Sequence, residues 1–451
     1  MGKGKQLRIV SALCLLAALS FFPFPFPPSP NSVSARAERG EAAVVSTSTR
    51  EGRLAVFDDT WSTINARYYD QQFNGLDWGA QRTVFRSLAA ETNSGAELYA
   101  VLRRMIASLN DPHTRVFAPH EKSDWWRPRF VSIGLSVREV GGLPTVVHVD
   151  RDSAPRRAGI RAGDVMETIN GELALSLVNG RLRNSLAPTT SARFRVFATL
   201  LEGPSETSVE IQWKGKKGNL RSGRFWRHWK QRELGLRIGR EKGEYAVIEI
   251  DAFTEPIARS FTTLLREKVN SLRGVIIDLR GNGGGDAEAM AHIASTFLGE
   301  GISLGRFTDR SGTSFTVSTP SKSLLVAQSI PQSGFSHGLP LIVLTSERTS
   351  SAAEIFIGAL KTSRRATIIG TETCGCVLAI RTRHLLPDGG LLDISELDYQ
   401  TSEGDRLEGH GIKPDEAVML QRSDLYSGRD RAMELAIGKL KALRNRTSPK
   451  R

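Results

Sequence analysis

A serine followed by small residues and a glutamate is the first candidate for chemistry. Residues 341–345 (LIVLT) form an apolar, β-branched run that predicts a buried strand, and a short turn leads from it to Ser351 at the start of a predicted helix. A helix N-terminus favours negative charge, including the charge that develops on an attacked carbonyl oxygen. The sequence SAAE from Ser351 to Glu354 is equally a capping box, which needs no catalysis. Spacing alone therefore favours a structural cap over a nucleophile.

A glycine-rich loop is the second candidate. It covers residues 278–286 (DLRGNGGGD) and directly follows another predicted buried strand. The three consecutive glycines let the backbone turn sharply and expose N–H groups, as an oxyanion hole or an anion-binding nest requires. The loop lacks the Lys-Ser/Thr of a phosphate-binding P-loop and the spacing of a dinucleotide motif. Taken by itself, such a run is more often a plain turn.

The first half of the chain divides into a helical part and a β-rich part. Residues 54–109 have apolar side chains at helical spacing, and this pattern ends at the turn signal Asn110-Asp111-Pro112, just before His113. Short β-type runs separated by turn residues then follow. These runs are 145–149, 165–169, 194–198 and 208–213.

The second half predicts an α/β core that carries both candidate sites. Apolar runs suited to central strands alternate with helical stretches, and a final amphipathic helix is expected at about 427–445. The predicted strands are 245–250, 274–279 and 341–345, and the predicted helices are 257–271, 286–298 and 351–363.

The N-terminus is typical of an export signal. A basic start is followed by an apolar run at 9–22, a proline-rich stretch and a small-residue cleavage site. Cleavage is predicted near Ala35 or Ala37, which gives a signal peptide at 1–37 and a polar linker at 38–52. A retained membrane anchor is the alternative, but the apolar run is short and the following prolines break helices. The protein is therefore expected to be exported, either to a periplasm or into the medium.

Composition and charge narrow the classes of partner. The net charge is +13, but Lys and Arg are spread along the chain. Diffuse basicity favours solubility and weak peripheral contact with anionic membranes, and no nucleic-acid motif is present. Removal of Cys14 with the signal leaves Cys374 and Cys376, which can form a disulfide, stay reduced or take part in a site. They are too few for a zinc site, and the sequence predicts no metal or cofactor and does not indicate the oligomeric state.

A long signature in the β-rich part resembles that of PDZ domains. Residues 153–165 (SAPRRAGIRAGDV) match the centre of those domains, and Ile133, Gly134 and Leu135 stand at their carboxylate-binding loop. The resemblance implies a PDZ domain at 128–215. Its backbone N–H groups would bind the C-terminal carboxylate of a peptide, which adds a strand to an exposed sheet edge.

The order of all these motifs resembles the tail-specific, or C-terminal-processing, serine peptidase family. The resemblance covers nearly the whole mature chain, and it implies an N-terminal helical domain at 53–120, a crotonase-like α/β peptidase core at 216–425 and a C-terminal helix with a basic tail at 426–451. The shared motifs are the DPHT turn at 111–114, the PDZ signature, the glycine loop, SAAE at 351–354 and GHGIKPD at 409–415.

The same resemblance assigns the nucleophile but leaves its base open. It implies Ser351 as nucleophile and an oxyanion hole formed by the N–H of Ala352 with that of Gly284 or Gly285. Family members with a Ser–Lys dyad carry Gly-Lys-Gly, followed shortly by Gln, downstream of the serine. Here Cys376 stands at the lysine position and Ile380 at the glutamine position. Lys361 cannot replace that lysine, because ten residues along a helix place it about 15 Å from the serine.

A second branch, similar to the tricorn core and to retinoid-binding-protein relatives, uses histidine and glutamate. His113 stands near the histidine of that branch, and Glu408 stands where its members place an acidic residue. The resemblance thus implies that Ser351 attacks a peptide carbonyl, His113 accepts its proton and Glu408 orients the imidazole. The alternatives are His410 as base and Asp286 or Glu354 as acid.

The expected function is that of an exported serine endopeptidase whose protein or peptide substrates are recognised through their free C-termini. A catalytically inactive, peptide-binding pseudoprotease is the first alternative, because the dyad lysine is missing. The second is thiol chemistry by Cys374 and Cys376, including a redox gate over the serine. Thiol reactivity requires a lowered pKa, which a sequence does not reveal.

Overall fold

The computed structural model describes residues 45–121, 128–183, 189–241, 245–268, 272–320 and 339–447. The predicted signal peptide and its cleavage site lie outside these residues. Within the described ranges, no helix has both the length and the apolar character needed to cross a membrane.

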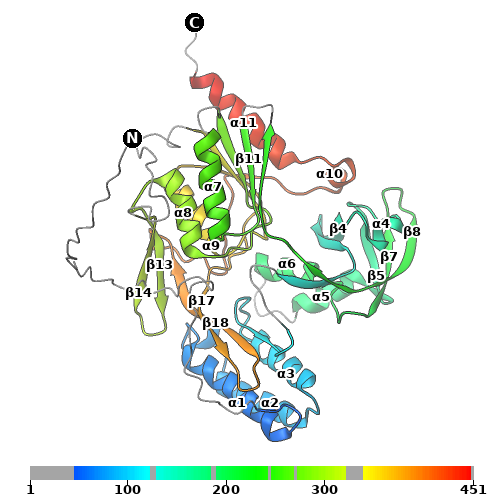
Figure 1. Cartoon of the computed structure of the whole chain (residues 1–451). Coiled ribbons are helices and arrows are strands. Elements are labelled where there is room, and N and C mark those ends of the chain that lie inside the picture. The colour runs from blue at the N-terminus through cyan, green and yellow to red at the C-terminus, as the bar shows by residue number, and fades with distance from the viewer. Residues whose placement is uncertain are drawn as a thin grey trace, which may run out of the picture. The chain divides into compact units, whose positions relative to one another are not determined.

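The N-terminal part is a bundle of helices, as predicted (Figure 1, blue). The first helix begins at Arg50, inside the stretch predicted as a linker up to residue 52, because the Thr49 hydroxyl accepts from the Gly52 N–H and caps it. Trp61 and Trp78 stack with their ring centroids 6.3 Å apart and join the first two helices. The helices are α1 (Arg50–Arg67), α2 (Trp78–Glu91) and α3 (Gly95–Ala107).

The β-rich part forms an antiparallel sheet with strand order β3-β4-β5-β7-β8. The strand predicted at 194–198 is wrong, since this segment belongs to helix α6 (Thr190–Ala198). A short apolar run is compatible with the repeat of a helix and with that of a strand. Here the Thr189 hydroxyl caps the segment as a helix, which buries Ala192 and Phe197. The strands of this sheet are β3 (Leu135–Val140), β4 (Leu143–Val149), β5 (Val165–Ile169), β6 (Glu172–Leu173), β7 (Ser208–Lys214) and β8 (Leu220–Trp226). A separate pair is formed by β2 (Arg129–Ser132) and β9 (His228–Gln231). The other helices of this part are α4 (Ala154–Arg157) and α5 (Ala174–Arg183).

The predicted α/β core is confirmed, and its strands and helices fall within a few residues of their predicted bounds. Its sheet has the order β10-β11-β12-β15-β16-β19, and every pair except β10 with β11 is parallel. The strands are β10 (Leu236–Glu241), β11 (Tyr245–Ile250), β12 (Gly274–Asp278), β15 (Leu341–Thr345), β16 (Thr367–Gly370) and β19 (Glu416–Ala417).

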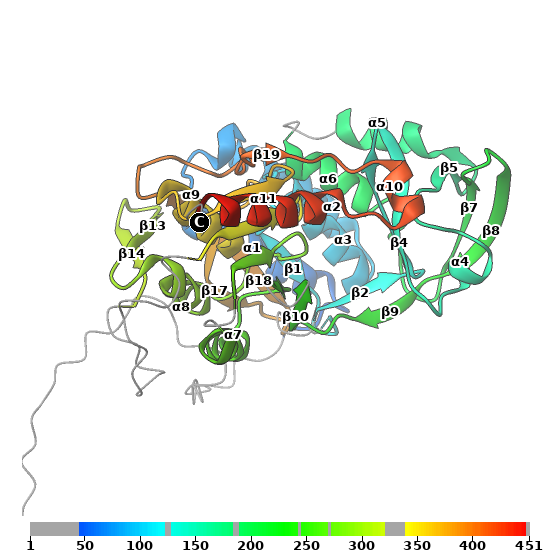
Figure 2. The same ribbon diagram turned by 90° about the horizontal axis from the view of Figure 1, so that it is seen from above.

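Helices cover both faces of this sheet (Figure 2). On one face, Leu440 and Ala436 of the last helix pack on Ile276 and Ile342 in the central strands. On the other face, the rings of Phe253, Phe261, Phe297 and Phe356 form an aromatic cluster. The helices are α7 (Glu255–Lys268), α8 (Ala287–Leu298), α9 (Ala352–Thr362), α10 (Arg422–Ser427) and α11 (Arg431–Thr447).

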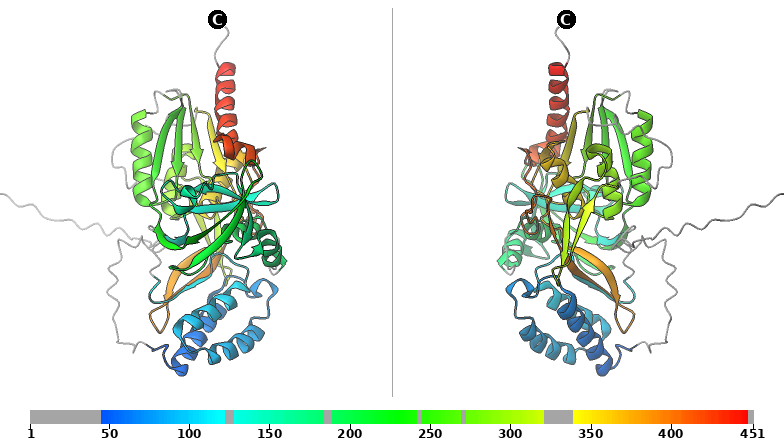
Figure 3. Two further views of the ribbon diagram at one scale, coloured as in Figure 1. Left: turned by 90° about the vertical axis from the view of Figure 1, so that its right-hand side faces the viewer. Right: turned by 90° about the vertical axis from the view of Figure 1, so that its left-hand side faces the viewer.

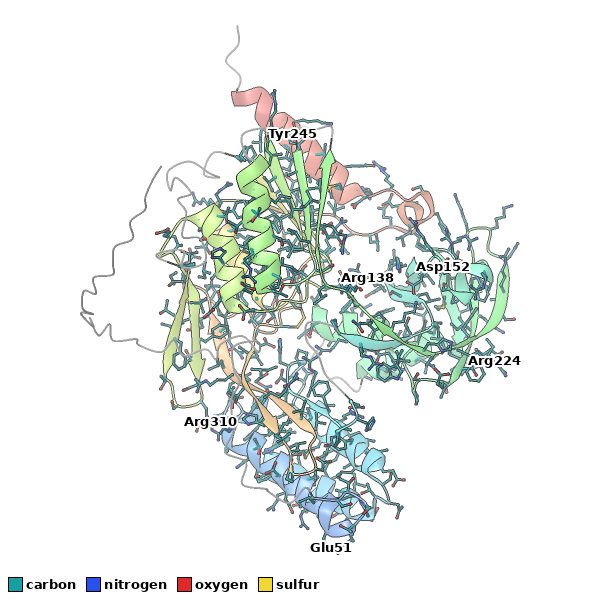
Figure 4. All side chains as sticks on the ribbon, in the orientation of Figure 1. Glu51, Arg138, Asp152, Arg224, Tyr245 and Arg310 are labelled. Atoms are coloured by element: carbon teal, nitrogen blue, oxygen red, sulfur yellow. A yellow bond between two sulfur atoms is a disulfide. The ribbon has the colours of Figure 1, made fainter. Side chains whose placement is uncertain are left out.

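A second sheet connects the helical part to the core, as the orange strands in Figure 3 show. Strand β1 pairs with β18, and Leu392 and Ile394 of β18 join the apolar core of the helical bundle. Arg310, labelled in Figure 4, adds a bond from the β13–β14 turn to the Asn65 carbonyl of α1 (2.6 Å). The strands of this sheet are β1 (Arg115–Phe117), β13 (Ser303–Asp309), β14 (Ser314–Ser318), β17 (Ala379–Leu385) and β18 (Leu391–Gln400).

Candidate active site

Ser351 is held in an uncommon backbone conformation between β15 and α9. Its φ of 57° lies in the left-handed region, which costs a non-glycine residue of order 1–3 kcal/mol and is typical of functional sites. The Ser351 N–H donates to the Cys376 carbonyl (2.8 Å) and to the Glu354 carboxylate (3.1 Å). The Glu354 N–H donates to the Ser351 carbonyl (2.8 Å), and the bond from the Ser351 N–H to the Glu354 carboxylate is the half of the predicted capping box that does not use the hydroxyl. The capping role that spacing favoured therefore does not occupy this hydroxyl.

The glycine loop lies directly against the serine. A Cβ atom on Gly284 would lie 2.6 Å from the Cβ of Ser351 and 3.1 Å from the nitrogen of Ala352. The Gly284 N–H already donates to the side-chain oxygen of buried Asn282 (2.7 Å). The N–H groups of Gly285 and Ala352 make no such bond among the described residues. Of the two glycines named from the sequence, Gly285 is therefore the one with a free donor.

Substitution of Gly284 tests how closely this loop must approach the serine. Gly284→Ala places a methyl group against Ser351 and is expected to lower kcat at least tenfold, because misplacing a reacting group by about 1 Å can cost about 100-fold. Gly312→Ala is the matched control, since Gly312 also has a positive φ but open space around it. The control should lose only about 1–2 kcal/mol of stability and no activity. Equal activity of the two variants in a peptide-hydrolysis assay contradicts the close approach.

Glu354 organises the backbone around the serine. It is fully buried, and its carboxylate accepts hydrogen bonds from the Thr373 hydroxyl (2.5 Å) and from the N–H groups of Gly375 (2.7 Å), Cys376 (2.9 Å) and Ser351 (3.1 Å). Burial raises the pKa of Glu354 to about 7, although these donors oppose the rise. The sequence offered Glu354 as part of a capping box and as an alternative acid, and its contacts are those of a group that positions the nucleophile.

The loop from Cys374 to Leu378 is held by two carboxylates. Glu354 accepts from the N–H groups of Gly375 and Cys376, and Glu408 accepts from those of Val377 (2.7 Å) and Leu378 (3.2 Å). Cys374 and Cys376 form a disulfide, which is one of the three states that the sequence left open. Glu408 is thus connected to the Ser351 environment through one short loop.

His113 lies in the turn that precedes β1. The turn is fixed to β18, because the Thr114 hydroxyl oxygen accepts from the Ser395 N–H (3.1 Å). The Asp111 carboxylate accepts from the His113 backbone N–H (2.8 Å) and lies 3.7 Å from the imidazole Nδ1, which is buried without a hydrogen-bond partner. Asp111 is therefore a carboxylate beside the imidazole, which the sequence did not single out.

Charged groups around His113 act on one another. Burial alone would raise the pKa of Asp111, but hydrogen bonds and the His113 imidazole lower it below the usual value. Burial raises the pKa of Glu408, and His113 partly opposes that rise. His113 and Glu408 are therefore electrostatic neighbours, although no hydrogen bond joins them within the described ranges.

The other candidates from the sequence have separate positions. Asp286 caps α8 through the Ala289 N–H (2.7 Å), His410 is exposed, and Lys361 lies 3.4 Å from Asp415. In the described part of the chain, the Ser351 hydroxyl and His113 are not hydrogen-bonded to each other, and no cluster of side chains could hold a metal ion. Hydrogen bonds between catalytic groups often tighten only when substrate binds.

The loop predicted to bind a peptide carboxylate is tightly packed. Gly134 has a φ of +93°, and a Cβ atom there would lie 2.5 Å from that of Ser153. The Gly134 N–H donates to the Ser132 hydroxyl (2.9 Å), while Ile133 and Leu135 bury their side chains in the core of the β-rich part. A carboxylate bound here would have to displace the Ser132 hydroxyl from that N–H.

Comparison with known proteins supports the peptidase assignment. Residues 244–418 match peptidase family S41, and residues 50–107 match the tricorn protease C1 domain. A chloroplastic C-terminal processing peptidase from Tetradesmus obliquus is 27% identical over 384 residues, which cover 83% of this chain and 79% of that protein.

Solved structures share the fold. Mature CPAF superposes with a TM-score of 0.64 at 14% identity and covers 83% of this chain and 94% of its own. The photosystem II D1 C-terminal processing protease superposes with a TM-score of 0.53 at 23% identity and covers 82% of this chain and 93% of its own. The solved structures show a shared fold, and the sequence matches identify the protein as a serine peptidase whose residues 244–418 are similar to family S41.

Proposed function

We propose that the protein is an exported serine endopeptidase with a crotonase-like core, which cleaves proteins or peptides recognised through their C-termini. The observation that carries this proposal is Ser351, held at a positive φ against Gly284 and next to the unengaged N–H of Ala352, with the unengaged N–H of Gly285 following in the same glycine loop. The relatives that are C-terminal processing peptidases support the same class of substrate.

The reaction follows from the positions of these groups. The Ser351 oxygen attacks the scissile carbonyl while His113 takes up its proton, and the oxyanion receives hydrogen bonds from Gly285 and Ala352. His113 then protonates the leaving amine as the C–N bond breaks, and water later hydrolyses the acyl-enzyme. Glu408, an electrostatic neighbour of His113, is the carboxylate proposed to orient the imidazole, and Asp111, 3.7 Å from Nδ1, is a second carboxylate beside it.

Substrate recognition is assigned to the β-rich part as a PDZ domain. A groove of about 820 Å³ is lined by Val140 and Phe194 of that part and by Thr345 and Glu347 at the end of β15. Arg138, labelled in Figure 4, crosses from β3 to Glu347 and hydrogen-bonds its carboxylate (2.6 Å). The residues that line this groove come from both the β-rich part and the core, and they include neither Gly134 nor Ser351.

The His113→Ala variant tests the proposed base. Loss of a general base typically lowers the rate 10²–10⁴-fold, so kcat for cleavage of an unfolded protein with an apolar C-terminus should fall by that amount at neutral pH. His410→Ala is the matched control and should retain activity, because the His410 side chain is exposed to solvent. Loss of activity in His410→Ala with retention in His113→Ala would reverse the assignment.

The second candidate function is that of a peptide-binding pseudoprotease. It is favoured by Cys376, which the resemblance aligns with the dyad lysine and which forms a disulfide with Cys374. The same cleavage assay separates the two functions. Wild-type protein that binds a C-terminal peptide but cleaves nothing would support the pseudoprotease.

A further inference from the structure

The Cys374–Cys376 disulfide connects two backbone contacts of the turn that carries the nucleophile. The Cys374 N–H donates to the Thr349 carbonyl (2.9 Å), and the Cys376 carbonyl accepts from the Ser351 N–H (2.8 Å). Each cysteine is thus hydrogen-bonded, through its own backbone, to residues 349–351. The disulfide ties these two contacts together.

The residue between the cysteines leaves little freedom for rearrangement. Gly375 has a φ of +69°, and a Cβ atom there would lie 2.6 Å from the nitrogen of Gly411. Its N–H donates to Glu354, and its carbonyl accepts from the Gly409 N–H (2.8 Å). The closed ring of the disulfide limits the conformations open to this glycine, and the observed one satisfies both contacts.

We propose that this disulfide positions Ser351 and that its reduction slows acylation of the serine. The inference rests on the proposed function. Without the bridge, Gly375 regains conformational freedom and the Cys376 carbonyl can turn away from the Ser351 N–H. The N–H groups of Gly375 and Cys376 keep their bonds to Glu354, whereas the Val377 N–H shares a peptide plane with the Cys376 carbonyl and leaves Glu408 when that carbonyl turns, so reduction disturbs the nucleophile without unfolding the core.

The two sulfur atoms differ in access. Cys374 is half-buried, whereas Cys376 is only 3% exposed, so an external thiolate attacks the Cys374 sulfur. A dithiol reductant first forms a mixed disulfide with Cys374, and Cys376 leaves as a thiolate and takes up a proton. The second thiol of the reductant then displaces the Cys374 sulfur. The protein gains two electrons and two protons, and the reductant becomes a cyclic disulfide.

The test is the rate at which a fluorophosphonate probe, and separately a peptide substrate, reacts with the full mature chain before and after dithiothreitol treatment. Cys14 is the third cysteine and is predicted to leave with the signal, so the reductant has one target. Reduction should lower both rates about tenfold or more, and reoxidation should restore them. The Cys374→Ser/Cys376→Ser double variant should react slowly in both conditions.

Several outcomes would overturn the inference. They are equal rates in both redox states, a double variant as fast as oxidised wild type, two titratable thiols in the untreated protein, or loss of the near-ultraviolet circular dichroism on reduction, which would mean unfolding. Failure of the proposed function gives a different result. In that case the oxidised wild type reacts no faster than Ser351→Ala.

Discussion

Replacing Ser351 by alanine is expected to lower kcat by at least about 10⁴-fold, because the acyl-enzyme can no longer form. Peptide affinity should be unchanged, since the Ser351 backbone makes the structural contacts and its hydroxyl makes none of the capping bonds. The measurement is single-turnover cleavage of a peptide, together with a binding titration of the same peptide.

Ser350→Ala is the matched control for this variant. Ser350 is the neighbouring serine, and its backbone carbonyl, which the substitution keeps, accepts from the Ala353 N–H (3.2 Å). The control should cleave within a few-fold of wild type. If Ser350→Ala is inactive while Ser351→Ala cleaves normally, the nucleophile has been assigned to the wrong residue.

Replacing Glu354 by glutamine is expected to lower kcat about 100-fold and to destabilise the fold at the same time. Glu354 accepts hydrogen bonds from four donors, and a glutamine NH₂ group would face donors where the carboxylate now accepts. Leaving a buried donor unsatisfied costs about 1–3 kcal/mol, and bonds to charged groups cost more. The Ser351 N–H would lose one of its two partners. Glu51→Gln, the same chemical change at an exposed position on α1, should alter neither property.

Ionisation of Glu354 is expected to lower the stability of the protein and to raise its activity as the pH increases. Burial raises its pKa from 4.5 to about 7, so the folded protein holds this proton more tightly than the unfolded chain does. The resulting stabilisation, roughly 3 kcal/mol, is fully present below pH 4.5 and is lost as the pH rises to about 7. Activity should rise over the same range, because only the ionised carboxylate can accept from all four donors.

Denaturant unfolding of wild type and Glu354→Gln between pH 4.5 and 8 measures this effect. The advantage of the wild type in free energy of unfolding should shrink as the pH rises toward 7 and then stay constant. A difference that does not change with pH would mean that Glu354 titrates at its ordinary value.

The elements of the core were predictable because their signals are local. The runs that become β11, β12 and β15 are rich in apolar, β-branched residues, which is typical of buried central strands. The helices between them have apolar side chains at the helical spacing of three and four residues. Helix α6 was missed because the apolar side chains at 194–198 fit either period and the deciding signal, the Thr189 cap, lies outside the run. Local patterns therefore predicted the layers of the fold better than its short connecting elements.

The geometry of the site depends on contacts that sequence spacing does not contain. His113 is brought near Glu408 by the pairing of β1 with β18, which joins segments far apart in the chain. The hydrogen bond that the Gly284 N–H donates to the Asn282 side-chain oxygen leaves Gly285 as the glycine with a free N–H. This bond depends on the direction of the Asn282 side chain, which the spacing of residues does not reveal. A capping pattern at Ser351 and Glu354 looks the same in a sequence whether or not the hydroxyl is used.

Labelling with a fluorophosphonate, followed by peptide mapping, identifies the nucleophile. We expect one stoichiometric adduct, on the Ser351 hydroxyl of the folded wild-type protein, and no adduct on Ser351→Ala. An adduct on another residue would contradict the assignment of the nucleophile. No adduct at all, from protein that still binds a C-terminal peptide, would contradict the catalytic function.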